Sequence, residues 1–192
     1  MIEIATVVRL QVQSARLKPG PALTRRYDPS PLRVVDALEV GPRGVVGLRG
    51  QDRLLDVHHA DHPDTRNNKL RNGLSLLPRI HYDRLRAGYG PHLVDGSAGE
   101  SVLVETAGFW DAHTFCRRVL LEVDGGQLEL ADVMAAPPCV EFSRYALGRE
   151  PGDTGPEVLA ALADRDEGAR GFYASARGEG VVRLGARLWG DG

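Results

Sequence analysis

Apolar and polar residues alternate along much of the chain with a period of two, the pattern of strands that bury one face. The alternation is clearest over residues 2–13. Shorter runs rich in β-branched residues, bounded by Gly, Pro or Asp, predict further strands. We expect these at residues 32–40, 45–46, 101–105, 119–123, 128–136, 172–176 and 181–188. The Asp124-Gly125-Gly126 turn predicts that two of them form a β-hairpin.

Helical signals are fewer and shorter. Pro near the start or Gly after the end marks expected helices at residues 78–87, 142–147 and 156–163. Residues 50–73 are polar without a clear period and predict a long loop, and loops of this length are usually functional or mobile. Because strands dominate, we expect residues 1–192 to form a single, mostly β domain with a closed or sandwiched sheet and a few short helices.

The charge and composition of the chain indicate which classes of binding partner are not expected. The 24 basic and 26 acidic side chains leave a formal net charge of −2, which argues against electrostatic binding to nucleic acid or to an anionic membrane surface. No apolar run approaches the ~18–20 residues needed to span a bilayer, and the first residues lack a signal-peptide pattern. We therefore expect a cytoplasmic protein whose two cysteines stay reduced.

Cys139 is the first candidate for chemistry. It follows Pro137 and Pro138, which end a strand, and a helix is expected to begin shortly after it. The positive end of that helix would favour the thiolate, which is the nucleophilic form. The alternative is a buried, inert cysteine at the base of the helix. Cys116 precedes two arginines, but no rigid element frames it, so a structural role is favoured there.

Histidine and aspartate residues are concentrated within residues 56–64. Both are transition-metal ligands, but their spacing matches no known metal motif, so no metal is assigned. The segment is either a solvated loop or a loop that binds anionic groups through Arg53, His58 and Arg66.

Arg170 and Gly171 open one of the last predicted strands. Arg170 offers a planar, permanently charged group for phosphate or carboxylate, and Gly171 would let the backbone approach a neighbour or a ligand closely. No Walker A motif, dinucleotide-binding GxGxxG or GxSxG elbow accompanies them, so the sequence indicates neither a nucleotide site nor a serine hydrolase.

Several short motifs follow one another in an order found in a known family. They are the glycine-rich stretch 44–53, the turn Gly99-Glu100-Ser101, Pro138-Cys139, and residues 170–173 followed by 180–185. Together they resemble the MOSC domain, named for the C-terminal region of molybdenum cofactor sulfurases. The chain departs from the family pattern where Leu54 replaces a common His, where Ser101 replaces Asn, and where an Arg before Pro-Cys is absent.

The resemblance implies a β-barrel with few helices, and it links the chain to sulfur handling and to the pterin-based molybdenum cofactor. In that family the matching cysteine is proposed to carry sulfur as a persulfide or to ligate molybdenum. Cys139 is the matching position here. The missing Arg and Asn are groups that would hold an anionic pterin. The resemblance therefore supports a role for the cysteine more strongly than it supports binding of this cofactor.

Three functions follow as hypotheses. In the first, Cys139 accepts sulfur and passes it to a small-molecule acceptor, while Glu100 and His58 move protons. The residues expected to bind an anionic ligand are Asp52, Arg53, His59, His62, Ser101 and Arg170. In the second, the domain binds the molybdenum cofactor or another anionic pterin without turnover. In the third, the scaffold serves as a lyase or tailoring enzyme in small-molecule biosynthesis. The partner in each case is a small molecule or a sulfur donor.

Overall fold

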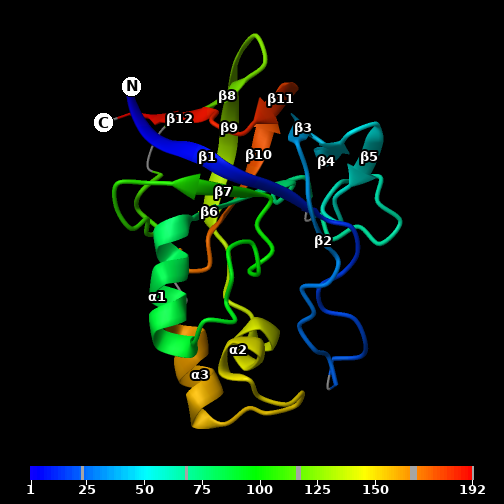
Figure 1. The fold of residues 1–192 in the computed structure, drawn as a ribbon, viewed down its shortest axis with the longest axis vertical. Helices are drawn as coiled ribbons and strands as arrows, with labels where there is room; N and C mark the ends of the chain where they lie inside the picture. Colours follow the sequence, from blue (N-terminus) through cyan, green and yellow to red (C-terminus); the bar gives the residue numbers. More distant parts are fainter. Residues whose placement is uncertain (23, 68, 116–117, 165–167, 192) are drawn as a thin grey trace.

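The computed structural model describes residues 1–22, 24–67, 69–115, 118–164 and 168–191. Cys116 lies outside these residues. Strands form most of the regular structure, and the helices gather below them (Figure 1). The strands are β1 (Ile2–Gln13), β2 (Leu32–Val34), β3 (Ala37–Gly41), β4 (Gly44–Arg49), β5 (Asp52–Leu55), β6 (Leu74–Pro78), β7 (Val102–Glu105), β8 (Val119–Val123), β9 (Gly126–Ala135), β10 (Phe172–Arg177), β11 (Gly180–Arg183) and β12 (Arg187–Gly190). The helices are α1 (Arg79–Tyr89), α2 (Val140–Leu147) and α3 (Pro156–Ala163).

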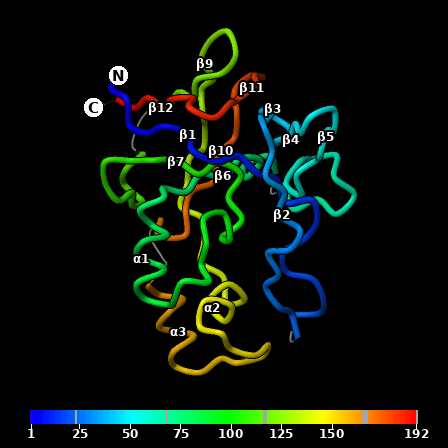
Figure 2. Tube along the Cα trace, viewed as in Figure 1, coloured from blue at the N-terminus to red at the C-terminus, as the bar shows by residue number. Residues whose placement is uncertain are grey.

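Seven strands close into a barrel in the order β12-β8-β9-β10-β6-β7-β1, and β1 returns to pair with β12. The ring is closed by the two ends of the chain, since Ile2 pairs with Gly190 and the termini lie side by side (Figure 2). Neighbouring strands are antiparallel except β6 and β7, which run parallel. Closure leaves the barrel without free edges, apart from the short strand β2 that pairs with the end of β1.

A smaller antiparallel sheet, in the order β11-β3-β4-β5, lies beside the barrel. The connection from β10 to β11 and the end of β1 tie it to the barrel, and Val35 and Leu38 join the barrel's apolar core. A second apolar cluster lies between the barrel and helices α1 and α2, built around Tyr82 and Phe142. The second cluster packs one end of the barrel against α2.

The mostly β fold with a closed barrel and three short helices among the described residues confirms the fold class expected from the sequence. The alternation over residues 2–13, the hairpin of β8 and β9, and helix α3 occur where predicted. None of the helices in the described part of the chain is both long and apolar enough to span a bilayer.

Several expectations about local structure were wrong. Strand β5 lies inside the stretch predicted as a loop, and β6 was not predicted at all. Two predicted strands are also divided, since 32–40 breaks between β2 and β3, and 181–188 breaks between β11 and β12. The first break occurs where the chain passes from β2 to the smaller sheet, and the second where it returns from the smaller sheet to the barrel, so tertiary pairing decides them rather than local propensity.

Candidate functional site

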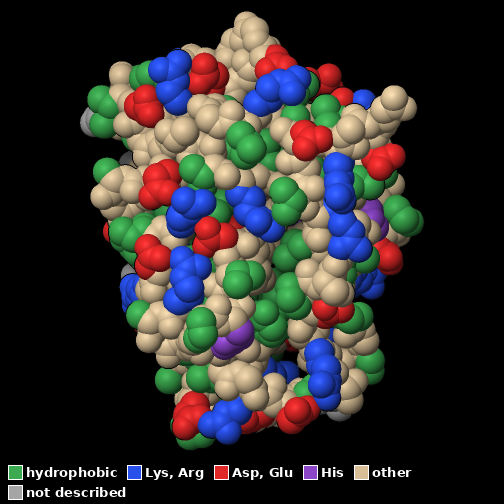
Figure 3. All heavy atoms as spheres, in the orientation of Figure 1, with side chains coloured by type: hydrophobic (Ala, Val, Ile, Leu, Met, Phe, Trp, Pro, Cys, Tyr) green, Lys and Arg blue, Asp and Glu red, His purple; other side chains and the backbone are tan. Residues whose placement is uncertain are grey.

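A cavity of about 300 Å³ opens at the end of the barrel that faces helix α2. Its walls come from the segments after β1, after β5, before β7, after β9 and before β10, all of which converge at this end. Figure 3 shows a hollow between α2 and the segment that precedes β2, with basic side chains at its edge. Loops held by a rigid barrel are a common setting for binding and catalysis.

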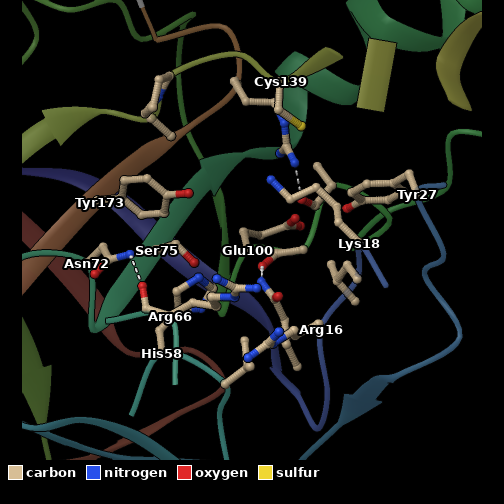
Figure 4. A pocket seen from close by; sticks show the side chains of 18 of the residues that line it. Arg16, Lys18, Tyr27, His58, Arg66, Asn72, Ser75, Glu100, Cys139 and Tyr173 are labelled. Carbon is tan, nitrogen blue, oxygen red and sulfur yellow. Dashed lines mark hydrogen bonds between the residues drawn. The ribbon is translucent and has the colours of Figure 1, made fainter. Parts of the chain in front are cut away.

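Cys139 lies at one end of this cavity, across from His58 and Arg66 (Figure 4). Strand β9 ends at Ala135, two prolines follow, and Cys139 is the N-cap residue of α2 with an extended backbone. Its carbonyl oxygen accepts hydrogen bonds from the backbone N–H and the hydroxyl of Ser143, which fix the first turn. The corner expected from Pro137 and Pro138 is therefore present, and the half-buried thiol lines the cavity.

Arg170 supplies a positive charge beside Cys139. Its guanidinium donates to the Ala98 carbonyl oxygen at 2.5 Å and lies 4.1 Å from the centre of the Phe142 ring. Burial alone would lower the pKa of Arg170, but the neighbouring Tyr27 and Cys139 outweigh it and raise that pKa. The side chain thus stays charged and forms no ion pair with a described carboxylate, so it is available to an anion.

Gly171 explains how Arg170 reaches this place. Its φ of +94° lies in the left-handed region, and a Cβ atom there would come within 2.6 Å of the Leu76 carbonyl oxygen. Only glycine allows the chain to pass this close to β6 just before β10 begins. The close backbone approach predicted for Gly171 is thus made to a neighbouring strand.

Glu100 is the only carboxylate among the described residues that line the cavity. It is 4% exposed, and its Oε2 accepts a hydrogen bond from the Tyr82 hydroxyl at 2.9 Å. Burial raises the pKa of Glu100 from 4.5 to about 7, although its own backbone N–H, the Tyr82 hydroxyl and Arg170 act against the shift. The group therefore changes its charge close to neutral pH.

His58 forms the opposite end of the cavity and is oriented by Asp56. One carboxylate oxygen of the buried Asp56 accepts from the His58 backbone N–H at 2.8 Å and lies 3.0 Å from Nδ1 of the same residue. The other accepts from the Gln13 backbone N–H at 2.7 Å. Because Nδ1 faces a carboxylate, it carries the proton, and Nε2 is left to accept or donate a proton elsewhere.

Basic groups outnumber this one acid around the cavity. The basic residues that line it are Arg16, Lys18, Arg25, Arg66 and Arg170. Arg16 is paired with Asp64 at 3.0 Å, and Arg25 approaches Glu141 at 3.7 Å. Lys18 and Arg66 form no ion pair with a carboxylate in the described ranges, and both are exposed at the rim. The electrostatics of the cavity therefore suit an anionic small molecule.

The candidate residues of the sequence divide between this cavity and other places. Cys139, Glu100, His58 and Arg170 come together in it. Arg53 and His59 instead line a separate, open groove on the smaller sheet, where Arg53 is paired with Glu39. Asp52 is exposed at the β4–β5 turn. His62 accepts a hydrogen bond from the Asp64 backbone N–H at its Nδ1 and lies outside the lining of the cavity.

Ser101 lies behind the cavity wall and pairs with Ser75, which lines it. Each serine hydroxyl accepts the other residue's backbone N–H at 2.9 Å, and the Ser101 hydroxyl donates to the Ser75 carbonyl oxygen at 3.0 Å. These bonds join the start of β6 to the residue before β7, so they support the parallel pair of strands.

Replacing Ser101 by Ala is expected to lower the free energy of unfolding by about 1–2 kcal/mol, because the Ser75 N–H loses its acceptor. Urea denaturation of Ser101→Ala, Ser75→Ala and the double variant measures this. The double variant should lose less than the sum of the single losses, since the two hydroxyls act on one another. Additive losses, or none, would show that the pair does not stabilise the strands.

Several residues that line the cavity were not identified as site residues from the sequence, among them Tyr27, Lys18 and Asn72. They lie in irregular segments, and the path of such segments does not follow from periodicity. Tyr27 is buried, donates its hydroxyl proton to the Ser97 carbonyl oxygen at 2.8 Å, and packs edge-on against Phe142. Burial raises the pKa of its phenol, so Tyr27 stays a neutral donor. Tyr173, quoted with Arg170 for its motif, also lines the cavity.

Solved structures with a similar fold share little sequence with this chain. The YuaD protein from Bacillus subtilis has 14% identity and a TM-score of 0.56, over 96% of this chain and 93% of that one. YiiM from Escherichia coli has 15% identity and a TM-score of 0.50, over 83% of this chain and 65% of that one. The fold is MOSC-like. This agrees with the order of motifs in the sequence.

A third structure, titled only as a hypothetical protein, has 12% identity and a TM-score of 0.56, over 97% of this chain and 67% of that one. No protein-family model matches the chain, and neither does any curated protein. At these identities the likeness concerns the MOSC-like fold alone. Within the described residues, no three His, Cys, Asp or Glu side chains are grouped as a metal site would need.

Proposed function

We propose that the cavity is a sulfur-handling site in which the Cys139 thiolate takes up sulfane sulfur and passes it to a small-molecule acceptor. The observation that carries the proposal is the position of Cys139, at the start of α2 and on the wall of a cation-rich cavity. The Arg170 guanidinium, which forms no ion pair with a described carboxylate, supplies positive charge on the same side of the cavity. The MOSC-like fold adds support through its resemblance to a family linked to sulfur chemistry.

The transfer needs no oxidant or reductant besides the sulfur donor and the acceptor. The Cys139 thiolate attacks the outer sulfur of a donor such as thiosulfate, forming a persulfide, and the S–S bond of the donor breaks to release sulfite. The terminal sulfur of the persulfide is then attacked by an acceptor nucleophile, which restores the thiolate. Arg170 would stabilise the negative charge in both steps, and His58 could give a proton to or take one from the acceptor.

The fold family also implies the molybdenum cofactor, and the cavity contains groups that fit it. A cysteine thiolate is a soft metal ligand, and Arg16, Lys18 and Arg66 suit a phosphate. When bound, the cofactor would supply a redox-active metal. Binding of this cofactor or another anionic pterin without turnover is therefore a second candidate function. Metal analysis of the purified protein, together with the fluorescence of released pterin, tests it.

Sulfur loading is tested by cyanolysis. Protein incubated with thiosulfate and then desalted should release about one thiocyanate per chain on addition of cyanide, which removes the terminal persulfide sulfur. Cys139→Ser is expected to release none. Serine is a favoured N-cap residue, so this variant should keep helix α2 and the fold.

Cys116→Ser is the matched control and should release as much thiocyanate as the unaltered protein. Thiocyanate release that survives in Cys139→Ser, or that is absent from the unaltered protein with every sulfane donor tried, would overturn the proposal.

A further inference from the structure

Glu100 has one carboxylate oxygen with a partner and one without. Oε2 accepts from Tyr82, whereas Oε1 is buried and accepts no hydrogen bond from the described residues. Figure 4 places this carboxylate near the middle of the cavity, between the end that holds Cys139 and the end that holds His58. Nearly all buried polar groups in proteins are hydrogen-bonded, so this oxygen offers an acceptor to a donor that enters the cavity.

The rim of the same cavity offers the complementary feature. Lys18 and Arg66 form no ion pair with a carboxylate in the described ranges, and both line the opening. A ligand in the cavity would therefore find these cations on either side of the lone acceptor (Figure 4). A volume of about 300 Å³ is at the small end of the range for small-molecule sites.

We propose that the cavity takes a small anion that also carries a neutral N–H donor. The acidic group of this ligand binds at Lys18 and Arg66, and its N–H donates to Oε1 of Glu100. The proposal rests on the proposed function only in that it names the class of molecule that enters the same cavity.

A neutral N–H fits Glu100 better than an ammonium does. The guanidiniums of Arg170 and Arg9 already act on Glu100, and both favour its charged form. An ammonium beside the carboxylate would be repelled by Arg170, whereas an amide or ring N–H supplies the missing hydrogen bond without a further charge.

The hydrogen bonds behind Glu100 have a fixed direction. The Ala98 backbone N–H donates to the Tyr82 hydroxyl at 2.7 Å, so the hydroxyl proton is directed to Oε2 of Glu100. In Glu100→Gln the side-chain oxygen must therefore take the place of Oε2, and the NH₂ group takes the place of Oε1. The variant presents a donor to the cavity where the wild type presents an acceptor.

This reversal gives the test. Hippurate carries a carboxylate and an amide N–H, and benzoyloxyacetate is its ester, in which oxygen replaces that N–H. Titration calorimetry at pH 8, where Glu100 is ionised, should show wild-type protein binding hippurate about tenfold or more tightly than the ester. Glu100→Gln should lose this preference or reverse it.

Two further variants separate the parts of the site. Lys18→Ala should weaken both ligands by the same factor, because both carry the carboxylate. Glu105→Gln, an exposed acid outside the cavity, should leave both affinities unchanged. Equal binding of amide and ester by the wild type, no binding of hippurate, or the same preference in Glu100→Gln would overturn the inference. Cyanolysis at Cys139 is measured without these ligands, so the two proposals can fail separately.

Discussion

Glu100→Gln is expected to gain about 3 kcal/mol of stability relative to the wild type between pH 4.5 and pH 8. Burial raises the pKa of Glu100 from 4.5 to about 7, so the folded protein holds this proton more tightly than the unfolded chain does. The stability that the neutral carboxyl contributes is complete below pH 4.5 and is lost as the pH rises through 7. Glutamine has no charge to bury, so the variant escapes that loss.

The free energy of unfolding is compared between variants because a second buried group, His81, also makes it depend on pH. The effect of His81 has the opposite sign to that of Glu100. His81 is 1% exposed, its Nε2 accepts the Trp110 backbone N–H at 3.1 Å, and burial lowers its pKa to about 4. Its contribution is therefore lost as the pH falls from 6.5 towards 4. Urea denaturation of wild type, Glu100→Gln and Glu105→Gln at several pH values cancels this effect. A pH-independent difference between the first two would contradict the prediction.

Asp56→Ala is expected to lower the free energy of unfolding by about 3–5 kcal/mol, since the buried carboxylate serves three N–H groups. Without it, the backbone N–H groups of Gln13 and His58 are left without acceptors close to the cavity. His58 also loses the partner that fixes its tautomer. Chemical denaturation measures the loss, and proton NMR of the His58 ring measures the change in its environment.

Asp52→Ala is the matched control for Asp56. Asp52 lies four residues earlier, is exposed at the β4–β5 turn, and should change stability by no more than about 0.5 kcal/mol. The same variant tests whether Asp52 takes part in ligand binding, as its motif suggested. Equal stability losses at the two positions would show that the hydrogen bonds of Asp56 contribute little.

The sequence predicts the elements whose own residues determine them. Strand β1 is long and alternates, the β8–β9 hairpin has a glycine turn, and α3 begins with proline. Strand β6 lacks such a signal, because Leu74, Leu76 and Leu77 are all buried and the run does not alternate. Strand β5 is an edge strand of four residues whose pairing with β4 overrides its polar sequence.

The sequence predicts the site residues that belong to its motifs, but not those whose positions depend on the paths of loops. Cys139, Glu100 and Arg170 each lie one or two residues before a strand or helix begins, so the order of elements brings them to one end of the barrel. His58 joins them through Asp56, whose role depends on a backbone N–H of β1 far away in sequence. Arg53 and His59 resemble good ligands locally, but the turn of β4 into β5 carries them to a different face.

The closure of the barrel by β1 and β12 also has a consequence for how the protein is made. Strand β1 is synthesised long before β12, which is one of its two barrel partners. Strand β12 lies between β1 and β8 in the barrel. Until β12 is in place, β1 and β8 each expose a row of unpaired backbone N–H and C=O groups. We therefore expect nascent chains to remain open to chaperones and to aggregation until β12 has left the ribosome, and to complete the ring only then.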